Sequence, residues 1–132
     1  MNIYYMPINL RDWNLFKKNV EHIENFRYKT GMRDGDMLLL YVTQKGIDDL
    51  KQERPIEYNE LPTIQNGIFG VARVIGKSYI SKDPEDYLYG EEVIDAKISH
   101  LCKTAPIISL IHSPKGQPYA LPQEVEVTVT KL

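Results

Sequence analysis

An apolar run, Met37–Thr43, follows directly on an Asp-Gly-Asp turn signal at 34–36. A run that does not alternate with polar residues is typical of a strand buried on both faces of a sheet. A second such stretch, Gly67–Gly76, carries Gly70 in its interior, where a backbone or a ligand can approach closely. The two runs predict a domain organised around a β-sheet.

Shorter patterns add further strands and one helix. Met1–Ile8 is rich in aromatic and β-branched residues, and Val93–Leu101 and Val125–Val129 alternate apolar with polar side chains, as half-buried strands do. Ala105–Ile111 is a further apolar segment. After the first strand, apolar residues recur at helical spacing and predict a helix with one buried face: Trp13, Phe16, Val20 and Ile23.

Acidic residues gather in two proline-containing stretches, within Gln44–Gln65 and within Ser81–Gly90. We interpret both as loops, the first with room for a short helix around Asp48–Glu53. The formal net charge is −2, but without these loops the framework is mildly basic. Net charge therefore does not exclude nucleic acid as a partner, although a solvated surface of mixed sign explains the charges equally well.

The residue inventory favours a binding module over an enzyme. Cys102 is the single cysteine, so the chain has no internal disulfide, and the three histidines lie far apart without metal-ligand spacing. Paired acids fall in turns and loops, and no phosphate-cradling glycine motif occurs. A pair of His100 and Cys102 on one strand face is conceivable, but a small, part-buried thiol is the preferred interpretation. We expect no catalytic residue, no metal and no cofactor.

Length and hydropathy indicate one cytoplasmic domain. The 132 residues suit a single domain, 1–132, which stands alone or forms the N-terminal module of a larger protein. No apolar run approaches the roughly 20 residues needed to span a bilayer, and the N-terminus lacks a secretory pattern. We therefore expect a cytoplasmic protein with no membrane partner.

Aromatic and basic side chains are interleaved in the first third of the chain. Aromatic rings stack on an unpaired base while cations hold the phosphates, so this mixture suits recognition of a flipped or single-stranded base. Trp13 is as well explained by a place in the hydrophobic core as by base binding. Tyr28 lies in a predicted loop, so a place in the core explains it less well. The candidate base-binding aromatics are Trp13, Phe26, Tyr28 and Tyr41. The candidate phosphate-binding cations are Arg11, Arg27, Lys29 and Arg33.

Three stretches, in their order, resemble the EVE domain family of the PUA-like superfamily, which also contains YTH domains. They are the opening strand and turn (Ile3–Trp13), a Gly-Asp turn with an apolar strand and a tyrosine (Gly31–Val42), and the glycine-containing strand before an acidic loop (Gly67–Gly76). Together they cover about the first two thirds of the chain. The chain departs from the family's pattern at Glu91–Val93, where a basic strand is usual.

The resemblance implies an α+β fold, a PUA-like mixed β-barrel with flanking helices, and a pocket for a modified base. Carried onto this chain, the pocket is formed by Asn9, which can hydrogen-bond a base edge, with Trp13, by the loop Phe26–Lys29 and by Tyr41. The expected function is non-catalytic recognition of a modified or flipped base in DNA or RNA, with modified DNA as first choice and a nuclease or ATPase as a further partner. The alternative is a protein-interaction or small-ligand module on the same barrel, because fold does not establish function.

Overall fold

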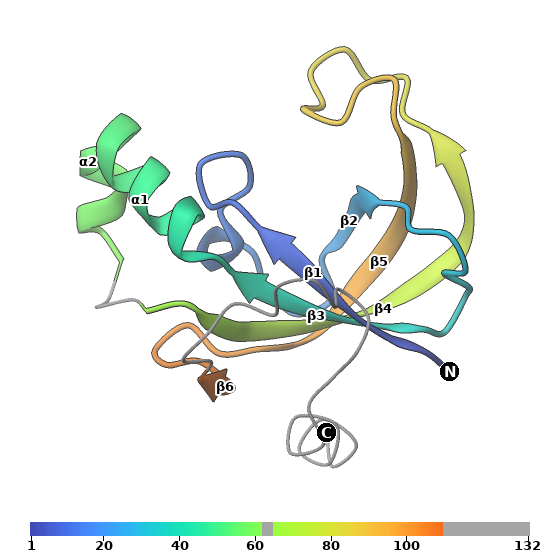
Figure 1. Ribbon diagram of the computed structural model, residues 1–132, viewed down its shortest axis with the longest axis horizontal. Coiled ribbons are helices and arrows are strands. Elements are labelled where there is room, and N and C mark those ends of the chain that lie inside the picture. The colour runs from blue at the N-terminus through green and yellow to red at the C-terminus, as the bar shows by residue number, and fades with distance from the viewer. Residues whose placement is uncertain (62–64, 110–132) are drawn as a thin grey trace.

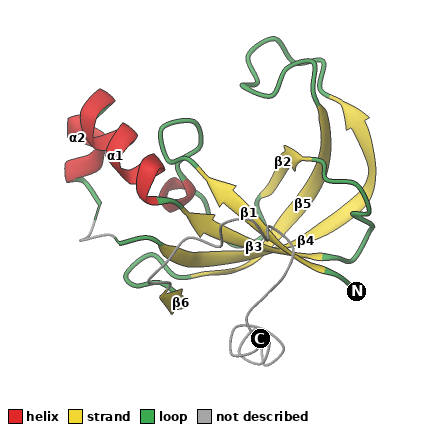
Figure 2. Ribbon diagram, viewed as in Figure 1, coloured by secondary structure: helices red, strands yellow, loops and turns green. Residues whose placement is uncertain are grey.

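The computed structural model describes residues 1–61 and 65–109. They form an α+β domain with one mixed sheet of strand order β1-β3-β4-β5-β2, to which β6 adds a short pairing with β4 (Figures 1 and 2). The strands are β1 (Ile3–Ile8), β2 (Ile23–Arg27), β3 (Met37–Val42), β4 (Gly67–Ile80), β5 (Glu92–Leu101) and β6 (Ile108–Ser109). The helices are the 3-10 turn η1 (Leu15–Lys17), α1 (Gln44–Glu53) and α2 (Pro55–Asn59).

The sheet is open over the described part of the chain. β1 pairs in parallel with β3, and β2 pairs antiparallel with β5, which leaves β1 and β2 as the two edges. The long strands β4 and β5 curve, so that their connecting loop stands over β2 (Figure 1). The predicted α+β class is confirmed, and a closed barrel is not formed by these residues.

The two apolar runs form neighbouring strands inside the sheet, as predicted. All six residues of β3 are buried, and so are the first six of β4. A Cβ added at Gly70 would lie 3.2 Å from the His100 carbonyl oxygen. The close approach expected at this glycine is therefore made by the backbone of the neighbouring strand. Of the apolar segment Ala105–Ile111, Ile108–Ser109 forms β6; the strand predicted over Val125–Val129 lies outside the described residues.

The helix predicted over 13–23 is wrong. Asn14 caps only the single turn η1, and Ile23 already begins β2. Trp13 stays buried, but Val20 and Ile23 are 45% and 52% exposed, so the helical spacing marks no common buried face. Pairing with β5 satisfies the backbone of β2, and this tertiary pairing outweighs a weak local preference for helix.

The acidic stretch Gln44–Gln65 is not one irregular loop. Thr43 caps α1, which buries Ile47 and Leu50, and Pro55 starts α2 at a position where proline is favoured. α1 contains the short helix expected around Asp48–Glu53 and begins four residues before it; its two buried apolar residues, three positions apart, are too few to mark that start in the sequence. The second acidic stretch, between β4 and β5, is a loop as predicted.

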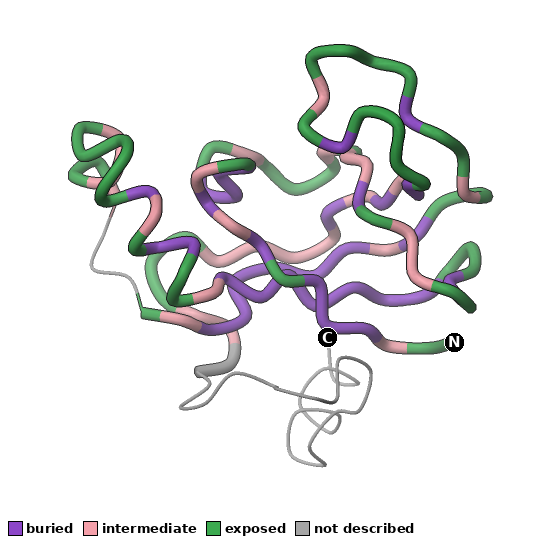
Figure 3. The backbone as a smooth tube through the Cα atoms, turned by 45° about the horizontal axis from the view of Figure 1, so that its top comes forward, coloured by how far each residue is buried: buried purple, intermediate pink, exposed green. Residues whose placement is uncertain are grey.

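Two apolar clusters lie on opposite faces of the sheet, because successive side chains of a strand point to opposite faces. Leu38, Leu40 and Val42 join the main core, and Met37, Leu39 and Tyr41 join the second cluster. Buried residues follow the strands, whereas the loop between β4 and β5 is largely exposed (Figure 3). Among the described residues, no helix is long and apolar enough to cross a membrane.

Candidate functional site

A pocket of about 240 Å³ lies where β1 ends, between β2 and the loop that joins β4 to β5. We call it the β1 pocket. Four residues singled out in the sequence line it together: Asn9, Phe26, Arg27 and Lys29. Asp12 and Tyr87 complete its polar and aromatic walls. The pocket is therefore assembled from three segments that are distant in the sequence.

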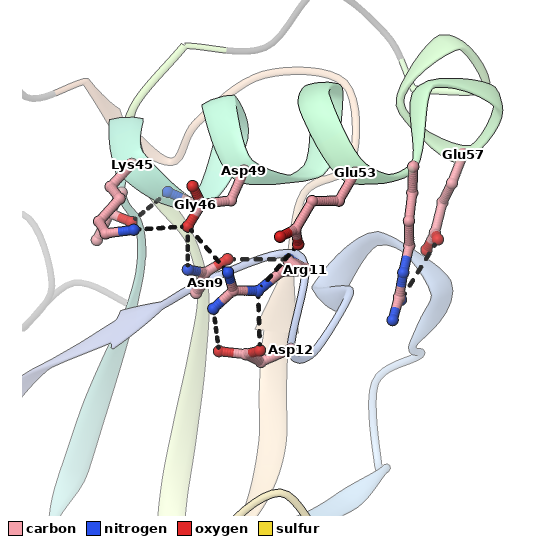
Figure 4. A network of polar contacts seen from close by, with 10 residues as sticks. Asn9, Arg11, Asp12, Lys45, Gly46, Asp49, Glu53 and Glu57 are labelled. Atoms are coloured by element: carbon pink, nitrogen blue, oxygen red, sulfur yellow. Dashed lines mark hydrogen bonds and ion pairs between the residues drawn. The ribbon is translucent and has the colours of Figure 1, made fainter.

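Asn9 is held at the edge of this pocket by its own side chain. Its Oδ1 accepts a hydrogen bond from the Arg11 backbone N–H at 3.0 Å, and its Nδ2 donates to Asp49 Oδ2 at 2.9 Å (Figure 4). A primary amide has two donor hydrogens, so one remains for a ligand. Gly46 makes the close approach of α1 possible, since a Cβ there would lie 2.7 Å from Asn9 Cα.

Arg11 does not face the β1 pocket as a free cation. Its guanidinium contacts Asp12 at 3.1 Å, Glu53 at 3.4 Å and Asp49 at 3.6 Å (Figure 4). The hydrogen bond and charge of Asp12 raise the pKa of Arg11, with smaller contributions from the other two carboxylates. Hydrogen bonds from Lys45 and Asn9 lower the pKa of Asp49, so this carboxylate stays ionised. We therefore assign Arg11 to the network that joins the β1 turn to α1.

The aromatic residues predicted for one site are distributed over three places. Phe26 is buried and lies edge-on to Trp13, with 5.4 Å between ring centroids. Tyr28 is half-buried and packs against the main core beside a separate hollow. Tyr41 is buried in the second cluster, on the opposite face of the sheet from Phe26. Of the four predicted rings, only Phe26 lines the β1 pocket.

The predicted cations also separate. Arg27 lies on the rim of the β1 pocket, with its guanidinium 2.9 Å from Glu91. Lys29 lines the same pocket, and its ammonium forms no ion pair with any residue that the structure describes. Arg33 instead lines the separate hollow of about 380 Å³, together with Tyr28 and Lys77. Lys29 and Arg33 thus line two different hollows.

Tyr87 is the residue of the β1 pocket that the sequence argument missed. It lies in the loop between β4 and β5 and is 55% exposed, while its neighbour Leu88 is 1% exposed and anchors the loop in the fold. Desolvation, reinforced by the charges of Asp12 and Glu24, raises the pKa of Tyr87 to about 12, so its ring stays neutral near pH 7. The available signal was an aromatic and apolar triplet, Tyr87–Tyr89, inside a stretch that is otherwise acidic.

The fold and pocket define a small α+β domain with a solvent-accessible aromatic and polar pocket. No protein-family model matches the chain, and no curated protein matches it in sequence. Two solved structures resemble it in fold. A protein of Pseudomonas syringae has a TM-score of 0.56 and 10% sequence identity, and the match covers 98% of this chain and 99% of the other protein. A hypothetical protein from Leishmania major has a TM-score of 0.51 and 14% identity over 85% and 71% of the two chains. At these identities the likeness concerns the fold alone.

Proposed function

We propose that the protein is a nucleic-acid-binding module of the EVE type, with a PUA-like fold, and that its β1 pocket receives one modified or flipped base. One observation carries the proposal: Asn9, Phe26, Arg27 and Lys29 converge with the exposed ring of Tyr87 on a single pocket. Pockets for drug-sized ligands span roughly 300–1,000 Å³. The smaller volume here, about 240 Å³, suits a single planar base.

Each wall of the pocket has a role in this proposal. The exposed ring of Tyr87 stacks on the face of the base, because every base offers a π-face to an aromatic side chain. The remaining amide hydrogen of Asn9 donates to an acceptor on the base edge. Phe26, fixed by Trp13, forms the apolar floor. Trp13 thus acts by supporting Phe26, and Tyr41 has no part in the pocket.

The phosphates are expected on the basic side of the pocket. Lys29 lies at the rim, and Arg33 with Lys77 continues the positive surface beside Tyr28. Arg27 shares its charge with Glu91 and is the weaker candidate. A strand whose base enters the β1 pocket would therefore run past Lys29 toward Arg33.

Salt dependence tests this assignment. For Lys29→Ala we expect weaker binding to every oligonucleotide, because one phosphate contact is lost. The slope of the logarithm of the binding constant against the logarithm of the salt concentration should fall in magnitude by about one. Fluorescence anisotropy over a salt series, with oligonucleotides carrying unmodified or methylated bases, measures both. Lys103→Ala removes a lysine that does not line the β1 pocket and should leave the slope unchanged.

A small-ligand or protein-interaction module is the second candidate function. It is favoured by the ion pairs of Arg11 with three carboxylates, which leave this predicted phosphate contact neutralised. The same salt series separates the two functions. Binding that is absent, or that does not fall as salt rises, would favour the second candidate.

A further inference from the structure

A larger cavity, of about 730 Å³, adjoins the β1 pocket beneath the loop that joins β4 to β5. Tyr87 lines both spaces, and Trp13, which lines the larger one, packs edge-on against Phe26 of the smaller one. A substituent on a base in the β1 pocket can therefore extend past Tyr87 into the larger space. We call this space the carboxylate cavity.

The carboxylate cavity carries an unbalanced negative charge. One lysine, Lys82, lines it, against five carboxylates. These carboxylates are Glu24, Asp83, Glu85, Asp86 and Asp95. Outside the cavity some acids are paired, as Asp49 is with Lys45 at 2.8 Å. Over the described residues, none of the five forms an ion pair with a lysine or arginine, and only Glu24 lies near a histidine, His22.

Neutral donors hold these carboxylates in place without cancelling their charge. Ser81 Oγ donates to Asp86 at 2.7 Å, and the Tyr79 hydroxyl donates to Asp95 at 2.6 Å. The indole N–H of Trp13 donates to Glu24. Burial acts to raise the pKa of Asp86, but hydrogen bonds from the Leu88 N–H, Asn25 and Ser81 outweigh it and lower the pKa, so Asp86 is ionised at neutral pH. Three of the five carboxylates, those of Glu24, Asp86 and Asp95, are thus held in place before any ligand arrives, while Asp83 and Glu85 lie on the exposed loop.

Aromatic faces form the other part of the lining. Tyr79 is 44% exposed and Tyr87 is 55% exposed, and both residues line the cavity. The hydrogen bond to Asp95, with desolvation and nearby carboxylates, raises the pKa of Tyr79 to about 12, so both tyrosines keep neutral rings. A cation is attracted to such a ring face as well as to the carboxylates.

The distribution of the acids argues for an organic cation over a metal ion. A metal needs several ligands around one point, at about 2 Å. Within the described part of the chain, no three His, Cys, Asp or Glu residues are grouped closely enough to hold one. An ammonium group on a flexible chain can instead use carboxylates on separate walls and aromatic faces between them. Phosphate is excluded by like charge.

We propose that the carboxylate cavity binds the primary ammonium group of an alkylamine substituent carried by the base in the β1 pocket. The modification read by this protein is then an amine-bearing side chain on the base. This inference rests on the proposed function and names the class of modified base that it takes.

The test compares two oligonucleotides that differ in one charge. Each carries a single 5-aminoallyl uracil, and in one of them the amine is acetylated, which removes its charge and lengthens the substituent by an acetyl group; the carboxylate variants then separate the effect of charge from that of size. We expect the free amine to bind about tenfold more tightly or better, in line with a charged hydrogen bond. In Asp83→Asn/Glu85→Gln the preference should fall to within about threefold, because both removed charges line the cavity.

A matched variant removes two charges from elsewhere on the surface. Asp48→Asn/Glu60→Gln changes two exposed acids of the helical region that do not line the cavity, and should keep the full preference. Equal binding of the free and acetylated amines overturns the inference and leaves base binding intact. A preference lost equally in both double variants also overturns it, since bulk charge is then the cause. Absence of binding to either oligonucleotide overturns the proposed function and the inference together.

Discussion

Gly46→Ala is expected to destabilise the protein by about 1–3 kcal/mol, the usual cost of adding a methyl group to a filled contact. Glycine to alanine inside a helix normally stabilises by up to about 1 kcal/mol, so helix propensity alone predicts the opposite sign. The added Cβ would lie 2.7 Å from Asn9 Cα and 3.0 Å from the Ile8 carbonyl oxygen. Backbone atoms cannot rotate away, so α1 and the turn after β1 must separate.

Urea denaturation, followed by tryptophan fluorescence, measures this change in the free energy of unfolding. Gln52→Ala, at an exposed position of the same helix, is the control and should change stability by less than about 0.5 kcal/mol. Ligand binding should weaken as well, because the turn that carries Asn9 forms one wall of the β1 pocket. A stabilised Gly46→Ala variant would contradict the packing described between α1 and β1.

Tyr87→Ala is expected to weaken oligonucleotide binding by about 5- to 150-fold, the equivalent of the roughly 1–3 kcal/mol found for stacking of one base on an aromatic ring. Tyr87 is 55% exposed and belongs to neither apolar cluster. The free energy of unfolding should therefore change by less than about 0.5 kcal/mol. Anisotropy titration and urea denaturation of the same variant separate loss of binding from loss of fold.

Tyr89→Ala is the matched control for this prediction. Tyr89 lies two residues away in the same loop and is 58% exposed, but it does not line the β1 pocket. Its removal should leave the affinity within about twofold, as is usual for a surface side chain outside a binding site. Equal losses for the two tyrosines would mean that the loop acts as a whole and that Tyr87 does not stack on the base.

Local sequence patterns predicted β3, β4 and β5, because a strand buried on one face alternates apolar with polar residues and a strand buried on both faces is a continuous apolar run. The unbroken run of β3 and the alternation in β5 are examples. Local patterns failed where pairing between segments that are distant in the sequence determines the secondary structure. Ile23 has helical spacing from Val20 and Trp13, yet its backbone pairs with Lys97 in β5. The short helix expected around Asp48–Glu53 is part of α1, but its start at Gln44 was missed because its buried face is only Gly46, Ile47 and Leu50.

The site was predictable in part for the same reason. Asn9 and the segment Phe26–Lys29 are short contiguous pieces that follow or end strands, and they meet at the pocket. Tyr87 arrives from a loop about sixty residues away, and no local pattern ties it to Phe26. In the sequence Arg11 has one acidic neighbour, Asp12, but α1 also brings Asp49 and Glu53 to it.

The most direct test of base binding at the β1 pocket is a chemical-shift titration. The ¹⁵N-labelled protein would be titrated with a short oligonucleotide carrying one modified base, and shifted amides would be mapped on the fold. We predict that the largest shifts fall on the amides of Asn9, Phe26, Lys29 and Tyr87, which line one pocket from three segments. Shifts that gather on α2 or on the face of Tyr41, with these four amides unmoved, would contradict the account.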